Sequence, residues 1–142
     1  MSDGTKDNFP VAAVRHFCDA VLLLNHDRFD NAMCHFAFAA ECAIKTLYKI
    51  HYEDNPKHLG HNMEKAWEDI KLCYTIMELM DADAGEWMGR LQIPECLFRD
   101  HPQRRYEGDI QYSDCDLEQS EFFVQKLIDK IITYALDGRW AM

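Results

Sequence analysis

The sequence predicts an all-α protein, an antiparallel up-and-down bundle of four to five helices. Apolar residues recur at the 3.6-residue helical period over several long stretches. Gly (6) and Pro (4) are scarce among the 142 residues, which disfavours a turn-rich β-sandwich. No stretch alternates apolar and polar residues long enough to predict a strand. The length fits one domain, so we expect a flexible tail at residues 1–9 and one helical domain at 10–142.

The first helix is expected from Pro10 to about Asn25. Proline favours the first helical turn, since its fixed φ and missing N–H cost nothing there. The residues expected on the inward face are Val14, Phe17, Cys18, Val21 and Leu24.

The second helix is expected from Phe29 to Tyr52. Its centre, residues 36–43, is apolar nearly all round and rich in alanine. A helix that is apolar on every side is a buried one, so this helix should lie in the middle of the bundle. Glu41 is the one carboxylate within this apolar stretch.

A third helix is expected from about Asn62 to Met80, after a loop that contains Asn55-Pro56 and Gly60. A shorter fourth helix is expected around Glu86–Phe98, where Pro94 should break or kink it.

The segment Arg99–Ser113 is polar and predicts an irregular connection. A last helix is expected from about Asp116 to Leu136. Asp137-Gly138 provides its C-terminal stop, because glycine readily adopts the left-handed conformation that ends helices.

Net charge limits the partners that we expect. There are 15 Lys and Arg against 25 Asp and Glu, a net charge of −10. A general nucleic-acid binder usually has the opposite sign, because affinity for phosphates comes from cations. The acidic field favours a basic partner, or a small ligand held in a locally basic pocket.

Neither the apolar runs nor the polar start predicts a membrane helix or a signal peptide. The six cysteines form no Cys-x-x-Cys pair, and four of them fall on apolar helix faces. We therefore expect reduced thiols, mostly in the core, in a cytoplasmic protein without membrane contact.

Glu41 and Lys45 are spaced for an ion pair on one helix, with the acid first. Such pairs are often exposed and weak. The alternative is a partly buried carboxylate that positions a ligand or an arginine, since a charge on so apolar a helix needs a partner. Arg105 is the partner that we expect for it.

Two segments concentrate positive charge and histidine. The loop before the last helix contains Arg99, His101, Arg104, Arg105 and Tyr106. Its guanidinium groups could bind phosphate or carboxylate, and Tyr106 could stack on a base. The alternative is a solvated loop whose arginines bond to helix ends. The second segment joins the second and third helices and ends at His61, and the sequence leaves open whether the two segments meet.

The histidines of that second segment predict no metal site. His51, His58 and His61 lack an accompanying Cys-x-x-Cys or His-Glu-x-x-His, and zinc needs three or four convergent ligands. The sequence also lacks a phosphate-binding glycine loop and a nucleophile elbow. We therefore predict neither a metal nor a cofactor, and we lean away from an enzyme.

The order of several short motifs resembles the HEPN family (higher eukaryote and prokaryote nucleotide-binding domains). Residues 39–45 read Ala-Ala-Glu-Cys-Ala-Ile-Lys, late in the second helix. His61-Asn-Met opens the third helix, and Arg105-Tyr106 precedes the last one. The resemblance covers about residues 10–137. It implies a helical bundle that acts as a homodimer.

HEPN members that are RNases carry an Arg-x(4–6)-His motif near the start of a late helix. Here Arg99-Asp-His101 is spaced too closely, and Glu107 replaces the proline that often follows Arg-Tyr. The matching spacing is Arg28 to His35, which falls in the second helix instead. These two residues are the candidate catalytic pair if the protein is an RNase.

The resemblance implies a non-catalytic binding or regulatory module linked to nucleotides or RNA. Such modules are paired with a nucleotidyltransferase or serve in toxin–antitoxin and defence systems. The expected ligand contacts are Arg104, Arg105 and Tyr106, with Glu41, Lys45 and His61 completing the site. The alternatives are an RNase toxin that uses Arg28 and His35, and an acidic immunity protein or antitoxin that neutralises a basic toxin.

Overall fold

The computed structural model describes residues 8–52, 56–80, 91–99, 101–106 and 112–138, without the side chains of residues 57, 58, 78, 80 and 105. The described chain contains helices and no strand, which confirms the all-α prediction. Its α-helices and 3₁₀ helices (η) are α1 (Phe9–Asn25), α2 (Phe29–Tyr52), η2 (Pro56–Leu59), α3 (Met63–Met80), α4 (Glu95–Phe98), η4 (Gln103–Tyr106) and α5 (Asp114–Leu136).

Helix α2 lies at the centre of the molecule, as its composition predicts. It contacts α1, α3, α4, α5, η2 and η4. Five of its alanines have no exposed surface: Ala32, Ala37, Ala39, Ala40 and Ala43. Small side chains let neighbouring backbones approach closely, and the larger Phe36, Ile44 and Leu47 fill the space between helices.

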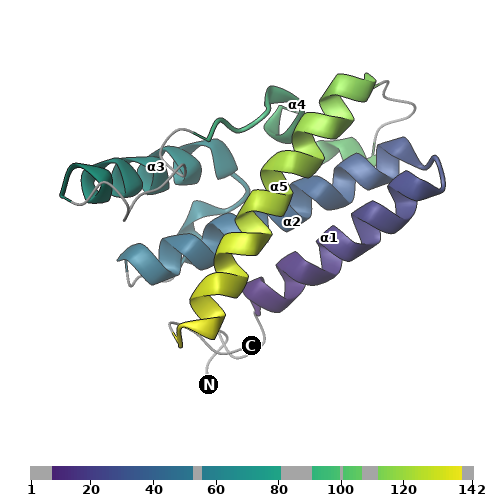
Figure 1. Cartoon of the computed structure of the whole chain (residues 1–142). Helices are drawn as coiled ribbons and strands as arrows, with labels where there is room; N and C mark the ends of the chain where they lie inside the picture. Colours follow the sequence, from purple (N-terminus) through teal and green to yellow (C-terminus); the bar gives the residue numbers. More distant parts are fainter. Residues whose placement is uncertain (1–7, 53–55, 81–90, 100, 107–111, 139–142) are drawn as a thin grey trace.

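The other helices are arranged around α2 at different angles. In Figure 1, α1 runs back alongside α2, α5 crosses obliquely in front of it, and α3 extends away from the first two helices. The start of α1 and the end of α5 lie at the same end of the molecule.

Local hydrogen bonds explain where α1 and α5 begin. The Asn8 side chain accepts a hydrogen bond from the Val11 amide, with Pro10 in the first turn of α1. At α5, the Ser113 side chain accepts from the Asp116 amide, and the Asp116 carboxylate accepts from the Ser113 amide. This reciprocal capping box starts α5 at Asp114, two residues earlier than predicted.

The inward face of α1 is the predicted one except at Cys18, since Val14, Phe17, Val21 and Leu24 pack against the core. Ala13 and Ala20 are fully buried, whereas Cys18 is exposed. At 100° per residue, Cys18 points roughly 140–160° away from both alanines. All six cysteines are free thiols, but only Cys42 and Cys96 are buried, so the expectation of mostly core thiols was wrong.

Of the predicted helix at Glu86–Phe98, the described part is helical only at Glu95–Phe98. Residues 86–90 lie outside the described residues, and 91–94 are not helical. Pro94 is extended (φ −63°, ψ 134°) and stands just before α4. Proline lacks an N–H and disfavours helical geometry in the residue before it, which explains why the helix begins only at Glu95.

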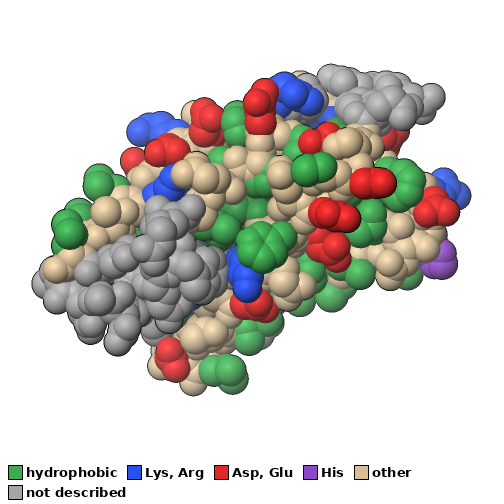
Figure 2. All heavy atoms as spheres, turned by 45° about the horizontal axis from the view of Figure 1, so that its top comes forward, with side chains coloured by type: hydrophobic (Ala, Val, Ile, Leu, Met, Phe, Trp, Pro, Cys, Tyr) green, Lys and Arg blue, Asp and Glu red, His purple; other side chains and the backbone are tan. Residues whose placement is uncertain are grey.

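The surface carries mixed charge. On the face shown in Figure 2, acidic, basic and hydrophobic side chains are interspersed. Among the described helices, none is both long enough and apolar enough to cross a membrane.

Candidate functional site

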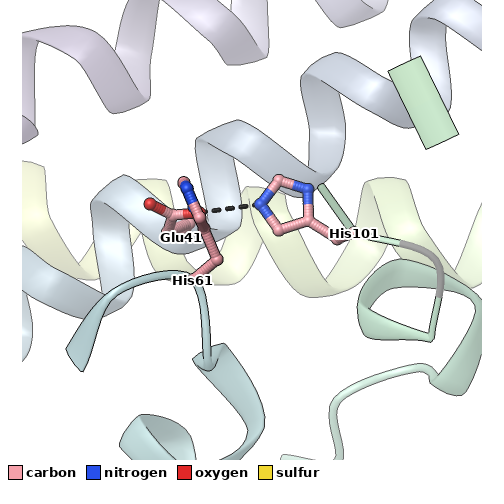
Figure 3. A group of neighbouring side chains, drawn as sticks. All are labelled: Glu41, His61 and His101. Atoms are coloured by element: carbon pink, nitrogen blue, oxygen red, sulfur yellow. Dashed lines mark hydrogen bonds and ion pairs between the residues drawn. The ribbon is translucent and has the colours of Figure 1, made fainter. Parts of the chain in front are cut away.

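The Glu41 centre is a group of four side chains from three segments: Glu41 and Lys45 of α2, His61 before α3, and His101 between α4 and η4. Glu41 is buried, with 6% of its surface exposed. Figure 3 shows the two imidazoles converging on the Glu41 carboxylate from separate loops.

The two carboxylate oxygens of Glu41 have different partners. Oε1 lies 2.8 Å from Nδ1 of His61 and 2.7 Å from Nε2 of His101. Oε2 accepts a hydrogen bond from Nζ of Lys45 at 2.9 Å. An ionised carboxylate can only accept, so both imidazoles donate their N–H to the same oxygen.

These hydrogen bonds keep the carboxylate ionised. Burial alone raises the pKa of Glu41, but hydrogen bonds from His101, His61 and Lys45 outweigh it and lower the pKa from 4.5 to about 2. Lys45 is itself buried and lies 5.2 Å from the centre of the Phe9 ring. The predicted intrahelical pair between Glu41 and Lys45 therefore forms, and it is buried rather than exposed.

His101 forms the enclosed side of the centre. Its side chain has no exposed surface, and its ring meets Phe38 edge-on with centroids 4.6 Å apart. Burial lowers the pKa of His101, although the Glu41 carboxylate acts in the opposite direction. With Nε2–H donated to Glu41, Nδ1 of this neutral ring is a buried acceptor that has no hydrogen-bond partner within the described structure.

His61 forms the open side of the centre, with 49% of its side chain exposed. It stands in a tight turn between Gly60, which has a left-handed φ of 57°, and Asn62, whose side chain accepts from the Lys65 amide. A narrow crevice beside it is lined by Glu41, Lys45, Gly60 and Asn62, among others. The centre therefore presents one imidazole to solvent and holds the other inside.

Arg104, a predicted ligand contact, has partners within the fold. It is buried, and its Nη2 donates to the carbonyl oxygens of Cys96 (2.8 Å) and Leu97 (2.6 Å) at the end of α4. Nη1 donates to the Tyr112 hydroxyl at 3.1 Å. These bonds satisfy carbonyls that a helix end leaves open. They match the alternative in which loop arginines bond to helix ends.

The other two predicted ligand contacts are Tyr106 and Arg105, and the structure describes the side chain of Tyr106 alone. Tyr106 is 79% exposed at the end of η4. The side chain of Arg105 lies outside the described residues, so its expected pairing with Glu41 stays a prediction.

Arg28 and His35 are the candidate RNase pair: Arg28 lies just before α2, and His35 lies in the second turn of this helix. Arg28 is exposed, and its carbonyl accepts the Ala32 amide hydrogen bond. Nδ1 of the half-buried His35 lies 3.0 Å from Nδ1 of His16 on α1. Burial, His35 and Arg15 lower the pKa of His16.

The structure brings three predicted site residues together, namely Glu41, Lys45 and His61, and adds His101. The two histidine-bearing segments thus meet, a point that the sequence left open. The sequence predicts that the Glu41 carboxylate needs a partner, but it does not predict that His101 is one of them. The signal that could have found it is this need together with a histidine in the loop that precedes the last helix.

The histidines that could hold a metal ion also differ from those first considered. Glu41, His61 and His101 each offer one ligand atom, and these atoms all lie within 4.8 Å of one another. His51 instead lies 2.8 Å from the Tyr74 hydroxyl, and the side chain of His58 lies outside the described residues.

Comparisons with protein-family models, with curated proteins and with solved structures find no match. The resemblance to the HEPN family therefore stays a prediction that rests on the motifs quoted above.

Proposed function

We propose that this protein is a non-catalytic binding module of HEPN-like architecture, whose ligand is a nucleotide or a short single-stranded RNA bound over the Glu41 centre. The observation that carries the proposal is an exposed imidazole, His61, held in one orientation by a buried, ionised carboxylate. A ring fixed before the ligand arrives loses little conformational freedom on binding.

The chemistry of the exposed groups fits this ligand class. His61 and Tyr106 are aromatic rings on which a base can stack, and both carry a hydrogen-bonding group. The His61 and His101 ring centroids are 5.7 Å apart, and Tyr106 follows His101 by five residues. Arg104 and Lys45 support the site from within, where one bonds to α4 and the other to Glu41.

Binding to a fluorescent ATP analogue and to a labelled single-stranded RNA tests the proposal. We expect His61→Ala and Tyr106→Ala to weaken binding by about tenfold each, because one stacked base contributes about 1–3 kcal/mol. His26→Ala is the matched control, since His26 is an exposed histidine just after α1. Absence of binding in the unaltered protein, or equal weakening by the control, contradicts the proposal.

The proposal includes a homodimer and a partner such as a nucleotidyltransferase or a cognate toxin. Native mass spectrometry of protein purified gently from its own host tests this part. Two copies with added mass of nucleotide or oligonucleotide size support it. A one-to-one complex with a basic protein instead supports the neutraliser alternative, which rests on the net charge of −10.

RNA cleavage is a second candidate function, favoured by the 2.8 Å contact between His61 and Glu41. A carboxylate that holds Nδ1–H of an exposed imidazole leaves Nε2 to take a proton, as a general base does. If the protein cleaves RNA in this way, His61→Ala abolishes cleavage and His35→Ala does not. The reverse result supports the pair Arg28 and His35.

A further inference from the structure

We propose that Glu41, His61 and His101 form a binding site for one divalent transition-metal ion of the zinc class. The proposal concerns the same centre as the proposed function, but it stands on the arrangement of ligand atoms. Oε1 of Glu41 lies 2.8 Å from Nδ1 of His61 and 2.7 Å from Nε2 of His101, and the three residues offer ligand atoms that all lie within 4.8 Å of one another. They come from three separate segments and converge on one point (Figure 3).

The donor set selects the class of ion. Two imidazole nitrogens and one carboxylate oxygen are the protein ligands of many zinc sites that keep a fourth position open for water. Calcium and magnesium prefer oxygen ligands. The Lys45 ammonium, which is bonded to Oε2, repels a cation and so disfavours ions that are held by charge alone. The two imidazole nitrogens must therefore supply much of the affinity for the metal ion.

The site is partly prepared for the ion. Lys45 holds Oε2 at 2.9 Å and leaves Oε1 facing the two rings. His101 is fixed by burial and by its contact with Phe38, as ligands in metal sites are fixed by their surroundings. His61 lies on the solvent side, where an ion and a water ligand can reach it.

Metal binding replaces the two hydrogen bonds at Oε1. A ring in its neutral form moves its single N–H proton from the nitrogen that binds the metal to its other ring nitrogen. In His61 that nitrogen is Nε2. In His101 it is Nδ1, the buried atom that has no partner within the described structure. No proton is released, and the carboxylate keeps its charge.

The hydrogen-bonded distances of 2.7 and 2.8 Å are shorter than the separation of two zinc ligands. With metal–ligand bonds of about 2.0–2.2 Å in tetrahedral geometry, ligand atoms lie roughly 3.3 Å apart. Both distances must therefore grow by about half an ångström: a shift of the His61 turn lengthens the first, and a small rotation of the Glu41 carboxylate away from His101 lengthens the second. The half-exposed ring, in a turn that contains Gly60, is the part of the centre best able to move.

The test is a Zn²⁺ titration of chelator-treated, reduced protein against a chromophoric zinc indicator. We expect one ion per chain, and at least tenfold weaker binding in His61→Ala and His101→Gln. His35→Ala is the matched control, because His35 also contacts a second imidazole, that of His16. Circular dichroism verifies that each variant is folded. If His101→Gln fails to fold, His61→Ala still decides the test, because it alters a half-exposed side chain.

Titration with Co²⁺ identifies the ligand atoms. We expect visible bands of a four-coordinate ion without a thiolate-to-metal band, and the same spectrum in the double variant Cys18→Ser, Cys115→Ser. Thiolate bands that disappear in this double variant would show adventitious binding at the exposed cysteines and overturn the proposal. Equal zinc affinity in His61→Ala, or no zinc binding at all, also overturns it.

Nucleotide binding measured in the presence of EDTA separates this inference from the proposed function. Retained nucleotide binding with no zinc binding removes only the metal site. Zinc binding without nucleotide or RNA binding removes only the proposed ligand.

Discussion

Two histidine networks on α2 differ in their charge and in their exposure to solvent. The first is the Glu41 centre, and the second joins His51, Tyr74 and Tyr134. His51 follows Glu41 by ten residues, about 15 Å along the helix. One network is organised by an ionised carboxylate, whereas the other joins an imidazole to two phenols within the described residues.

The His51 network holds the last part of α2 to α3 and α5. His51 Nε2 lies 2.8 Å from the Tyr74 hydroxyl, which lies 2.8 Å from the Tyr134 hydroxyl. Both tyrosines are buried. Within the described residues these groups hydrogen-bond to one another, and the network joins three helices as part of the core.

The Glu41 centre concentrates charge and opens to solvent at His61. It also leaves Nδ1 of His101 as a buried acceptor without a partner in the described structure. The comparison indicates that buried histidine alone does not mark a functional site. We placed the proposed ligand site at the Glu41 centre because a fixed charge stands there beside one exposed ring.

Removing the carboxylate should have the largest effect on stability. Glu41→Ala leaves the Lys45 ammonium and two imidazole N–H groups without their acceptor inside the protein. We expect a loss of about 3–5 kcal/mol in the free energy of unfolding, as for broken buried ion pairs. Urea denaturation measures it. A loss below 1 kcal/mol would show that the centre is not held by Glu41.

Acid should weaken the Glu41 centre. The folded-state pKa of Glu41 (about 2) lies below its ordinary 4.5, so its contribution is present above pH 4.5 and is lost as the pH falls toward 2. The lowered pKa of His101 acts in the same direction, with its contribution lost below pH 6.5. The loss from Glu41 is roughly 3 kcal/mol, at about 1.4 kcal/mol per pKa unit.

Urea denaturation at pH 7, 4.5 and 3 tests this dependence, with Glu41→Gln as the control. The amide does not titrate, so the variant should lose less stability than the unaltered protein between pH 4.5 and 3. Parallel pH profiles for the two proteins would contradict the role given to the carboxylate.

Tyr74→Phe should break the His51 network with a smaller effect. It removes the hydroxyl between His51 and Tyr134, which is worth about 1–2 kcal/mol in the free energy of unfolding. Ligand binding at the Glu41 centre should stay unchanged, since no charge is altered. A loss of nucleotide or zinc binding in Tyr74→Phe would show that the two networks are coupled.

His61→Ala should have the smallest effect on stability and a large one on binding. The side chain is 49% exposed, and Lys45 and His101 still satisfy the carboxylate. We expect a change below about 1 kcal/mol in thermal or urea denaturation, in line with one partly exposed hydrogen bond. A change as large as that of Glu41→Ala would make His61 a structural residue.

Much of the fold can be predicted from the sequence, because long helices with one apolar face show a 3.6-residue periodicity of apolar residues. The bounds of α2 are those predicted, and its central position follows from its alanines. On α1, four of the five residues predicted on the inward face pack against the core, and only Cys18 is exposed. The prediction missed Ala13 and Ala20, which are fully buried because close approach to α2 favours small residues.

The candidate site could be predicted in part. A carboxylate in an apolar helix indicated that donors must converge on it, and Glu41, Lys45 and His61 are in contact. That His101 completes the group depends on how the loop between α4 and η4 folds back onto α2. This path is set by tertiary contacts, including the burial of Arg104 against α4, which no local pattern encodes.

Nitrogen NMR of the seven histidine side chains during titration with ATP, and separately with single-stranded RNA, tests most directly whether the Glu41 centre is the ligand site. We predict that the ring resonances of His61 and His101 shift with added ligand, while those of His51 stay in place. Shifts confined to His16 and His35, or no histidine shifts at saturating ligand, would contradict the assignment of function to this centre.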